Sequence, residues 1–129
     1  MAVSFHRDDV TRRITVVVTG PLFATEILSV VDRQAEEGLW DYACLYDERL
    51  MTLPPRVVDV SAIAHYVLEL TNVHGPRGPV AVVAQRAGSV DAYARVSKHI
   101  GFAFQVFDDV SDAERWLEQR GQASANPRR

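Results

Sequence analysis

Hydrophobic positions near the start of the chain alternate with polar ones. Val3 and Phe5 are separated by one polar residue, and an apolar, β-branched run from Ile14 to Val18 follows an acidic turn at residues 8–9. Alternation with period two predicts a strand with one buried face, whereas an unbroken β-branched run predicts a strand covered on both faces. Because too few residues join the two segments for a helical crossover, we expect an antiparallel hairpin.

Apolar residues recur every three or four positions in four later segments, which predicts four amphipathic helices. Gly38 follows the first of these segments as a helix stop. Residues Ser111 to Glu114 have the spacing of a capping box, which predicts the start of the last helix. The inward-facing positions are expected to be Phe23, Ile27, Val30 and Val31 in the first helix, Ile63, Tyr66, Val67 and Leu70 in the second, Val90, Tyr93, Ala94, Ser97 and Ile100 in the third, and Ala113, Trp116 and Leu117 in the fourth.

Three further apolar runs, at residues 42–46, 80–84 and 102–106, predict strands between these helices. The charged residues 47–49 are expected to end the first of them, and the alternation in the last is typical of a strand at a sheet edge. The predicted order is therefore β-β-α-β-α-β-α-β-α. Helices between successive strands imply parallel pairing through right-handed crossovers.

The predicted fold class is α/β: a single domain with a mixed five-stranded sheet and four helices, in which the first strand is antiparallel and the others are mainly parallel. We expect this domain to span residues 1–120, and a flexible polar tail to follow at residues 121–129. A length of 129 residues fits one domain, and 47% apolar with 24% charged residues fits a soluble globular protein.

Charge and hydropathy argue against two classes of partner. A formal net charge of −3 argues against nucleic acid, because phosphate binding depends on a basic surface. No stretch approaches the roughly 20 apolar residues of a membrane-spanning helix, and residues 1–13 lack the apolar centre of a signal peptide. We therefore expect a cytoplasmic protein without membrane contact. The single cysteine, Cys44, permits no intrachain disulfide, and its apolar neighbours predict a buried side chain.

Two features of the second half of the chain occur in a recognisable order. A strand at residues 79–84 precedes a helix that carries Tyr93-Ala94-Arg95, and a strand ending in Val106-Phe107 precedes Ala113-Glu114-Arg115-Trp116-Leu117. Many SpoIIAA-like sequences finish with a strand ending in V-F and then an A-x-x-W-L segment. The chain therefore resembles the SpoIIAA-like branch of the STAS/SEC14-type fold, over residues 2–120 in element order and over the final third in recognisable residues.

This resemblance implies a cytoplasmic and mostly non-enzymatic role. The best-known members are anti-anti-sigma factors, which bind a kinase-like partner and are switched off by phosphorylation of a serine. That serine lies in a D-S-x-G motif at the start of the second helix. The corresponding stretch here, residues 46–61, has Thr52 and Ser61 as its only Ser/Thr residues and lacks the motif. The phosphorylation switch therefore does not carry over to this chain.

Polar residues follow three of the predicted parallel strands at their carboxyl ends, where ligands bind in open α/β sheets. These residues are Thr19, Asp47, Arg49, Arg86 and Ser89. Beside helix N-termini, they predict a crevice for a small anionic ligand or a nucleotide. The alternative interpretation is that all five are solvated turn residues and helix caps, and the chain contains no glycine-rich phosphate motif.

No combination of residues predicts catalysis, a metal or a cofactor. His65 and Glu69 are four positions apart on the second helix, but an HExxH pattern and a third ligand are absent. A G-x-S-x-G nucleophile elbow is also absent. We therefore expect no catalytic residue, no metal ligand and no cofactor, and a non-enzymatic function is favoured over an enzyme.

Two functions remain as hypotheses. The first is a non-catalytic STAS-like regulatory module that binds a protein partner or itself, through an edge strand or exposed helix faces. The second is a binder of a small anionic ligand in the crevice, which a ligand-induced rise in melting temperature would reveal.

Overall fold

The computed structural model describes residues 3–53, 56–85, 93–94 and 101–125 of the chain. These residues form one five-stranded sheet in the order β1-β2-β3-β4-β5. β1 is antiparallel to β2, and all other neighbours are parallel. The mixed α/β sheet and its pairing are thereby confirmed. The strands are β1 (Val3–Asp8), β2 (Arg13–Pro21), β3 (Ala43–Leu53), β4 (Val80–Val83) and β5 (Phe104–Phe107).

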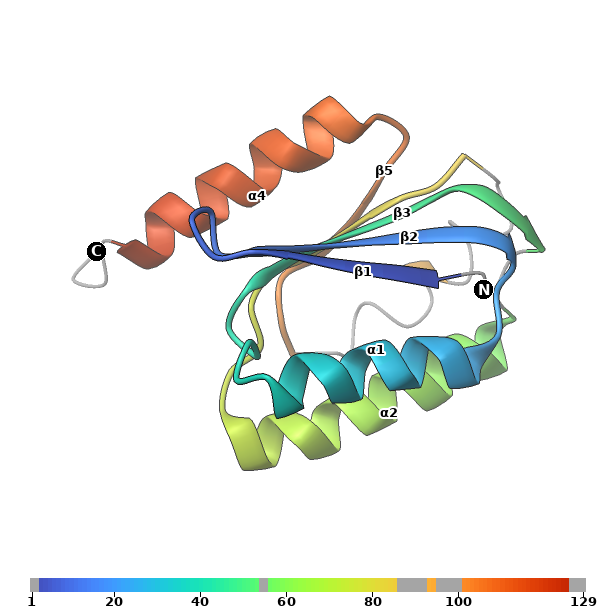
Figure 1. Cartoon of the computed structure of the whole chain (residues 1–129), viewed down its shortest axis with the longest axis horizontal. Coiled ribbons are helices and arrows are strands. Elements are labelled where there is room, and N and C mark those ends of the chain that lie inside the picture. Colours follow the sequence, from blue (N-terminus) through green and yellow to red (C-terminus); the bar gives the residue numbers. More distant parts are fainter. Residues whose placement is uncertain (1–2, 54–55, 86–92, 95–100, 126–129) are drawn as a thin grey trace.

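The helices lie in two layers on either side of the sheet. They are α1 (Ala24–Glu36), α2 (Val57–His74) and α4 (Val110–Ala125). Figure 1 shows α1 and α2 together on one face and α4 alone on the other. The described residues thus hold three of the four predicted helices. The other, predicted after Gly88, lies outside the described residues except for Tyr93 and Ala94, which are helical.

The larger core lies between the sheet and the pair α1 and α2. Ile14, Val16 and Val18 of β2 are at most 1% exposed and face these helices, whereas Thr15 and Val17 are only partly buried. The expectation of a strand covered on both faces is therefore wrong for β2. The reason is that α4 packs on β3, β4 and β5 and leaves the second face of β2 partly open.

A smaller core holds α4 against the other face of the sheet. Ala113 and Leu117 of α4 pack against Leu45, Ala81 and Val83. The predicted inward positions of this helix are confirmed. Trp116 is partly buried, with its ring centroid 5.7 Å from that of Phe107.

The N-cap of α4 lies two residues before the predicted one. The Asp109 carboxylate accepts a hydrogen bond from the backbone N–H of Ser111, so Asp109 rather than Ser111 caps the helix. The helix also continues to Ala125, past the expected domain end at residue 120. Similarly, Phe23 lies at the N-cap of α1, where its side chain is 54% exposed instead of facing inward.

β3 is longer than predicted, because the charged residues 47–49 do not end it. The strand runs to Leu53 and continues to pair with β2, with Thr19 opposite Leu50 and Gly20 opposite Met51. Strand geometry turns alternate side chains to opposite faces. Consequently Asp47 and Arg49 point to one side of the sheet, and Glu48 points into the core beneath α1 and α2.

The predicted burial of Cys44 is confirmed. Cys44 is 1% exposed, and burial raises the pKa of its thiol. Trp40 is 4% exposed in the larger core. His74 is the last residue of α2, and His6 is exposed on the edge strand β1. Among the described residues, no helix has the length and apolar character needed to cross a membrane.

Candidate functional site

A cavity of about 80 Å³ lies in the larger core, between the sheet and the helices α1 and α2. One water molecule needs about 10–15 Å³ by this measure, so the cavity has room for several waters or a small organic molecule. Most of its wall is apolar, and includes Ile27 and Val31 of α1, Ile63 and Val67 of α2, and Val80 and Val82 of β4. Four polar side chains interrupt this wall, namely Tyr46, Glu48, Arg77 and Tyr93.

Strand β3 supplies two of these polar groups. Cys44, Tyr46 and Glu48 alternate along the strand and therefore face the same helices. Tyr46 is 6% exposed, and burial raises the pKa of its hydroxyl to about 12. Glu48 is 3% exposed, which is rare for a carboxyl group without a cationic partner.

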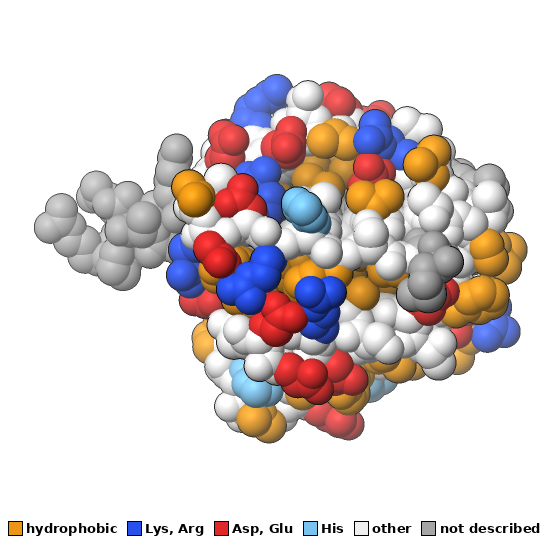
Figure 2. Space-filling view, in the orientation of Figure 1, with side chains coloured by type: hydrophobic (Ala, Val, Ile, Leu, Met, Phe, Trp, Pro, Cys, Tyr) orange, Lys and Arg blue, Asp and Glu red, His pale blue; other side chains and the backbone are white. Residues whose placement is uncertain are grey.

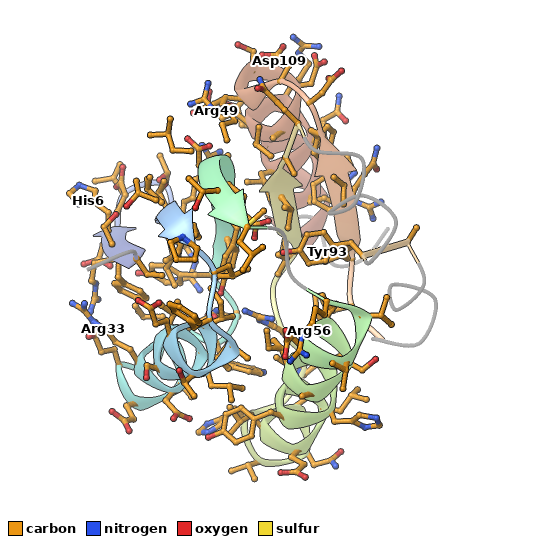
Figure 3. The ribbon with its side chains drawn as sticks, turned by 90° about the vertical axis from the view of Figure 1, so that its right-hand side faces the viewer. His6, Arg33, Arg49, Arg56, Tyr93 and Asp109 are labelled. Carbon is orange, nitrogen blue, oxygen red and sulfur yellow. The ribbon has the colours of Figure 1, made fainter. Side chains whose placement is uncertain are left out.

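Glu48 is held by a hydrogen bond from Tyr93. The Tyr93 hydroxyl lies 2.9 Å from Oε1 and 2.7 Å from Oε2 of Glu48. Burial raises the pKa of Glu48 to about 7, against the opposing effect of the Tyr93 hydrogen bond, and the charge of Asp47 adds to the rise. Glu48 is therefore divided between its neutral and charged forms near neutral pH. Figure 3 shows Tyr93 between the sheet and α2.

Arg77 enters the cavity from the loop between α2 and β4. This loop lies close to the start of β3, because the Gly78 N–H donates to Trp40 O over 3.1 Å. A Cβ at Gly78 would lie only 2.4 Å from Tyr42 O, so glycine is needed for this approach. The Trp40 indole Nε1–H also donates to Gly75 O over 3.0 Å. The position of Arg77 is thus fixed by contacts on both sides of it in the sequence.

The Arg77 guanidinium is surrounded by aromatic and neutral polar groups. Its Cζ lies 5.2 Å from the ring centroids of both Trp40 and Phe102. Nη2 donates to Oε1 of Gln34 over 3.1 Å. Nε is fully buried and has no hydrogen-bond partner. Among the described residues, no carboxylate lies within 4.0 Å of Arg77, so its charge has no ion pair.

Tyr46 is close enough to both Arg77 and Glu48 to be affected by their charges. The positive charge of Arg77 and a hydrogen bond with it lower the pKa of the Tyr46 hydroxyl, whereas the negative charge of Glu48 raises it. No ion pair joins Arg77 to Glu48 directly. The cavity therefore has a cationic end at Arg77 and an acidic end at Glu48, with apolar side chains along its length.

The structure places the predicted crevice residues elsewhere. Asp47 and Arg49 do come together, as an ion pair with 2.8 Å between Nη2 and Oδ2, and Arg49 holds the pKa of the Asp47 carboxyl below its usual value. Figure 3 shows Arg49 near Asp109, on the side of the sheet that α4 covers. Thr19 is exposed on β2. None of these three lines the cavity, and Arg86 and Ser89 lie outside the described residues.

Sequence reasoning missed Glu48, Gln34 and Arg77, whereas it placed Tyr46 in a strand and Tyr93 on the inward side of a helix. Glu48 is two residues beyond Tyr46 and would have been assigned to the core had the strand been continued through the charged triplet. Gln34, which is 1% exposed and bonds to Arg77, lies three residues after Val31 on the apolar stripe of α1. Arg77 lies in a loop without any pattern, so no sequence signal was available for it.

The structure also shows where the other titratable candidates lie. His65 and Glu69 are exposed on α2. Within the described part of the chain, no group of three or more His, Cys, Asp or Glu side chains is placed to hold a metal ion.

Comparisons with known proteins show a likeness to a solved structure. No protein-family model matches the chain, and no curated protein matches it. Among solved structures, it is similar to an uncharacterised protein of the DUF3478 family from Shewanella loihica PV-4, described as having a SpoIIAA-like fold. The two are 18% identical with a TM-score of 0.58, and the match covers 90% of this chain and 92% of that one. The resemblance noted in the sequence is thus confirmed at the level of the fold: this chain has a SpoIIAA-like fold.

Proposed function

We propose that this chain is a non-catalytic binding module that takes a small, mostly apolar molecule in the cavity between the sheet and α1 and α2. The observation that carries the proposal is the cavity itself, an apolar space with a few convergent polar groups. This combination is typical of small-molecule sites. Small-molecule binding was the second function hypothesised from the sequence, but there the ligand was a small anion or a nucleotide and the site was the crevice.

The polar groups of the cavity support binding rather than a closely packed core. A buried charged group ordinarily has an ion-pair partner, because an unpaired charge in an apolar interior is costly. Here the described partners are uncharged: the Tyr93 hydroxyl for Glu48, and Gln34, Tyr46, Cys44 and two aromatic rings for Arg77. Each can make a further hydrogen bond to a molecule in the cavity.

Thermal-shift screening at pH 7 tests the proposal, because a ligand that binds the folded state raises the melting temperature by mass action. The panel contains small carboxylic acids, their neutral amides and matching alcohols. A saturable rise that disappears in Val82→Phe, which fills the cavity, supports it. A second filling variant, Ile63→Phe, guards against misfolding of the first. A panel without any saturable shift contradicts the proposal, as does a shift retained in both folded variants.

The crevice at Asp47 and Arg49 remains the competing location for a small anionic ligand, together with Thr19, Arg86 and Ser89. Arg49 already has its charge neutralised by Asp47. An anion must therefore compete with that ion pair. Loss of the thermal shift in Arg49→Met, with a retained shift in the cavity-filling variants, would favour the crevice.

A second candidate function is binding of a protein or of another copy of the chain at the edge strand β1. A groove of about 340 Å³ lies between β1 and α1 and is lined by residues that include Val3, Phe5 and Val30. An added strand could pair with β1 and place side chains in this groove. Figure 2 shows this face with acidic and basic side chains mixed among hydrophobic ones. Such charges usually protect an edge strand against pairing, so we rank this candidate second.

Sedimentation analysis separates the two candidates. Self-association at β1 predicts a dimer that Phe5→Lys abolishes, whereas the small-molecule proposal predicts a melting-temperature shift that this variant leaves unchanged. Phe5 is suitable because it faces the groove and not the cavity.

A further inference from the structure

Arg77 is partly buried at the cavity wall, and among the described residues its positive charge has no negative partner. Its Nε is fully buried and makes no hydrogen bond, and no carboxylate of the described residues lies within 4.0 Å of it. The described groups around it are the rings of Trp40 and Phe102, the amide of Gln34, the Tyr46 hydroxyl and the Cys44 thiol. None of them carries a charge.

The surroundings also restrict the position of the partly exposed Arg77 side chain. Gln34 is fixed by its own hydrogen bonds, in which Nε2 donates to Leu39 O over 2.9 Å and to Trp40 O over 3.3 Å. Its Oε1 is thereby presented to Arg77. The guanidinium is kept at the wall of the cavity with one N–H group, at Nε, that has no hydrogen-bond partner, which is a preorganised donor for an anion.

We infer that Arg77 binds the carboxylate of a small monocarboxylic acid, whose apolar body lies along the cavity towards Glu48. This inference rests on the proposed function and names the class of ligand. A carboxylate has two oxygens that match parallel N–H donors of a guanidinium. The apolar body would contact the side chains of Val80, Val82 and Ile63, which line the same cavity.

Two observations favour a carboxylate over a phosphate. Arg77 brings one positive charge, and no Lys or other Arg lines the cavity within the described residues. A phosphate monoester carries up to two negative charges and three acceptor oxygens, and one guanidinium does not satisfy it. Glu48 at the other end, when charged, repels a second negative group in the same space.

Matched acids and amides test the inference by isothermal titration at pH 7. The probes are benzoate and benzamide, hexanoate and hexanamide, and octanoate and octanamide. Each pair has nearly the same shape and differs in charge. We expect at least one acid to bind at least about tenfold more tightly than its amide, because hydrogen bonds to a charged group are stronger than neutral ones.

Two substitutions test whether Arg77 causes the preference for acids over amides. Arg77→Met should reduce the acid-to-amide ratio to near one, whereas Arg115→Met, an exposed arginine on α4 that pairs with Asp112, should leave it unchanged. If Arg77→Met does not fold, the Nε–Hε resonance of Arg77 in the natural chain serves instead, and acids but not amides should shift it.

The outcomes separate this inference from the proposed function. Equal binding of acid and amide overturns the role of Arg77 and leaves the cavity as a binding site. Failure of every probe to bind overturns both. A preference for acids that survives in folded Arg77→Met but is lost in Arg49→Met overturns the inference in favour of the crevice.

Discussion

Charged residues have different partners on the two faces of the sheet. On the α4 face, Asp47 and Arg49 pair with each other at the partly exposed rim, and the core beneath is closed by the small side chains of Ala81 and Ala113, both 0% exposed. On the opposite face, beside a cavity, Glu48 is buried and Arg77 is partly buried, and neither forms an ion pair with a described residue.

This difference indicates which face has a structural role and which has room for a ligand. Small residues let α4 approach the sheet closely, and this close packing leaves no space for a ligand. The α1 and α2 face instead keeps polar groups that the fold itself does not pair. Such groups reduce stability unless something binds them.

The largest expected effect is on the closed face. Leu117→Ala removes a side chain that is 2% exposed and should lower the free energy of unfolding by about 2–5 kcal/mol, because a new cavity forms in a tightly packed core. Ile63→Ala on the open face should cost less, roughly 1–2 kcal/mol, since Ile63 is partly buried and already borders empty space. Urea unfolding measures both. Equal losses would contradict the contrast between the faces.

Glu48 makes stability depend on pH. Its pKa is about 7 in the folded chain and 4.5 normally, so between these values the folded state binds the proton more strongly. Stability therefore falls as pH rises through this window, by about 3 kcal/mol in total, and stays low above it. Glu48→Gln should remove this fall, so that the variant is more stable than the natural chain at pH 8 and similar at pH 4.5.

The control for this prediction is Glu118→Gln, an exposed glutamate on α4, which should change stability by less than about 0.5 kcal/mol at either pH. Thermal and urea unfolding at both pH values provide the measurement. The other titratable or charged groups near Glu48 are Tyr46, Asp47 and Tyr93. A Glu48→Gln variant that is less stable than the natural chain at pH 8 would show that the carboxylate has a cationic partner.

Removal of Arg77 should have a small effect on the ligand-free chain. An arginine with a buried carboxylate partner typically costs about 3–5 kcal/mol when it is removed, because the partner is left unpaired. Since Arg77 has no such partner, Arg77→Met should stay within about 1 kcal/mol of the natural chain. A loss near the larger value in urea unfolding would mean that an internal anion pairs with Arg77.

The smallest effect is expected at the rim of the α4 face. Asp47→Asn breaks a partly exposed ion pair and should cost about 0.2–1 kcal/mol at low salt. The difference should shrink at 1 M salt, where charges on exposed groups are screened. A cost that is unaffected by salt would indicate that the Asp47 carboxylate acts through hydrogen bonds within the fold and not through its charge.

Most of the fold followed from local patterns in the sequence. The stripes of α1, α2 and α4 and the alternation in β1 reflect the periods of helices and strands, which depend on neighbours in sequence. β3 was predicted too short because its charged triplet resembled a turn. Its extension depends on pairing with β2, which no local pattern reports. Similarly, a helix cap at Asp109 competes with one at Ser111, and both have suitable side chains.

Less of the site could be predicted from the sequence, because its residues are far apart along the chain and come together only in the fold. Arg77 reaches the cavity only because Gly78 allows its loop to approach Tyr42 on another part of the chain. Glu48 and Tyr93 are 45 residues apart. Asp47 and Arg49 attracted attention because charged residues near strand ends are visible in the sequence, whereas the unpaired state of Arg77 is visible only in three dimensions.

The most direct test of the contrast between the two faces is a methyl NMR titration with octanoate. We expect saturable shifts of the methyl groups of Ile63, Val67 and Val82, which border the cavity, and none of those of Leu45, Val83 and Leu117 beneath α4. Shifts confined to the second group, or an absence of saturable shifts in both, would contradict this expectation.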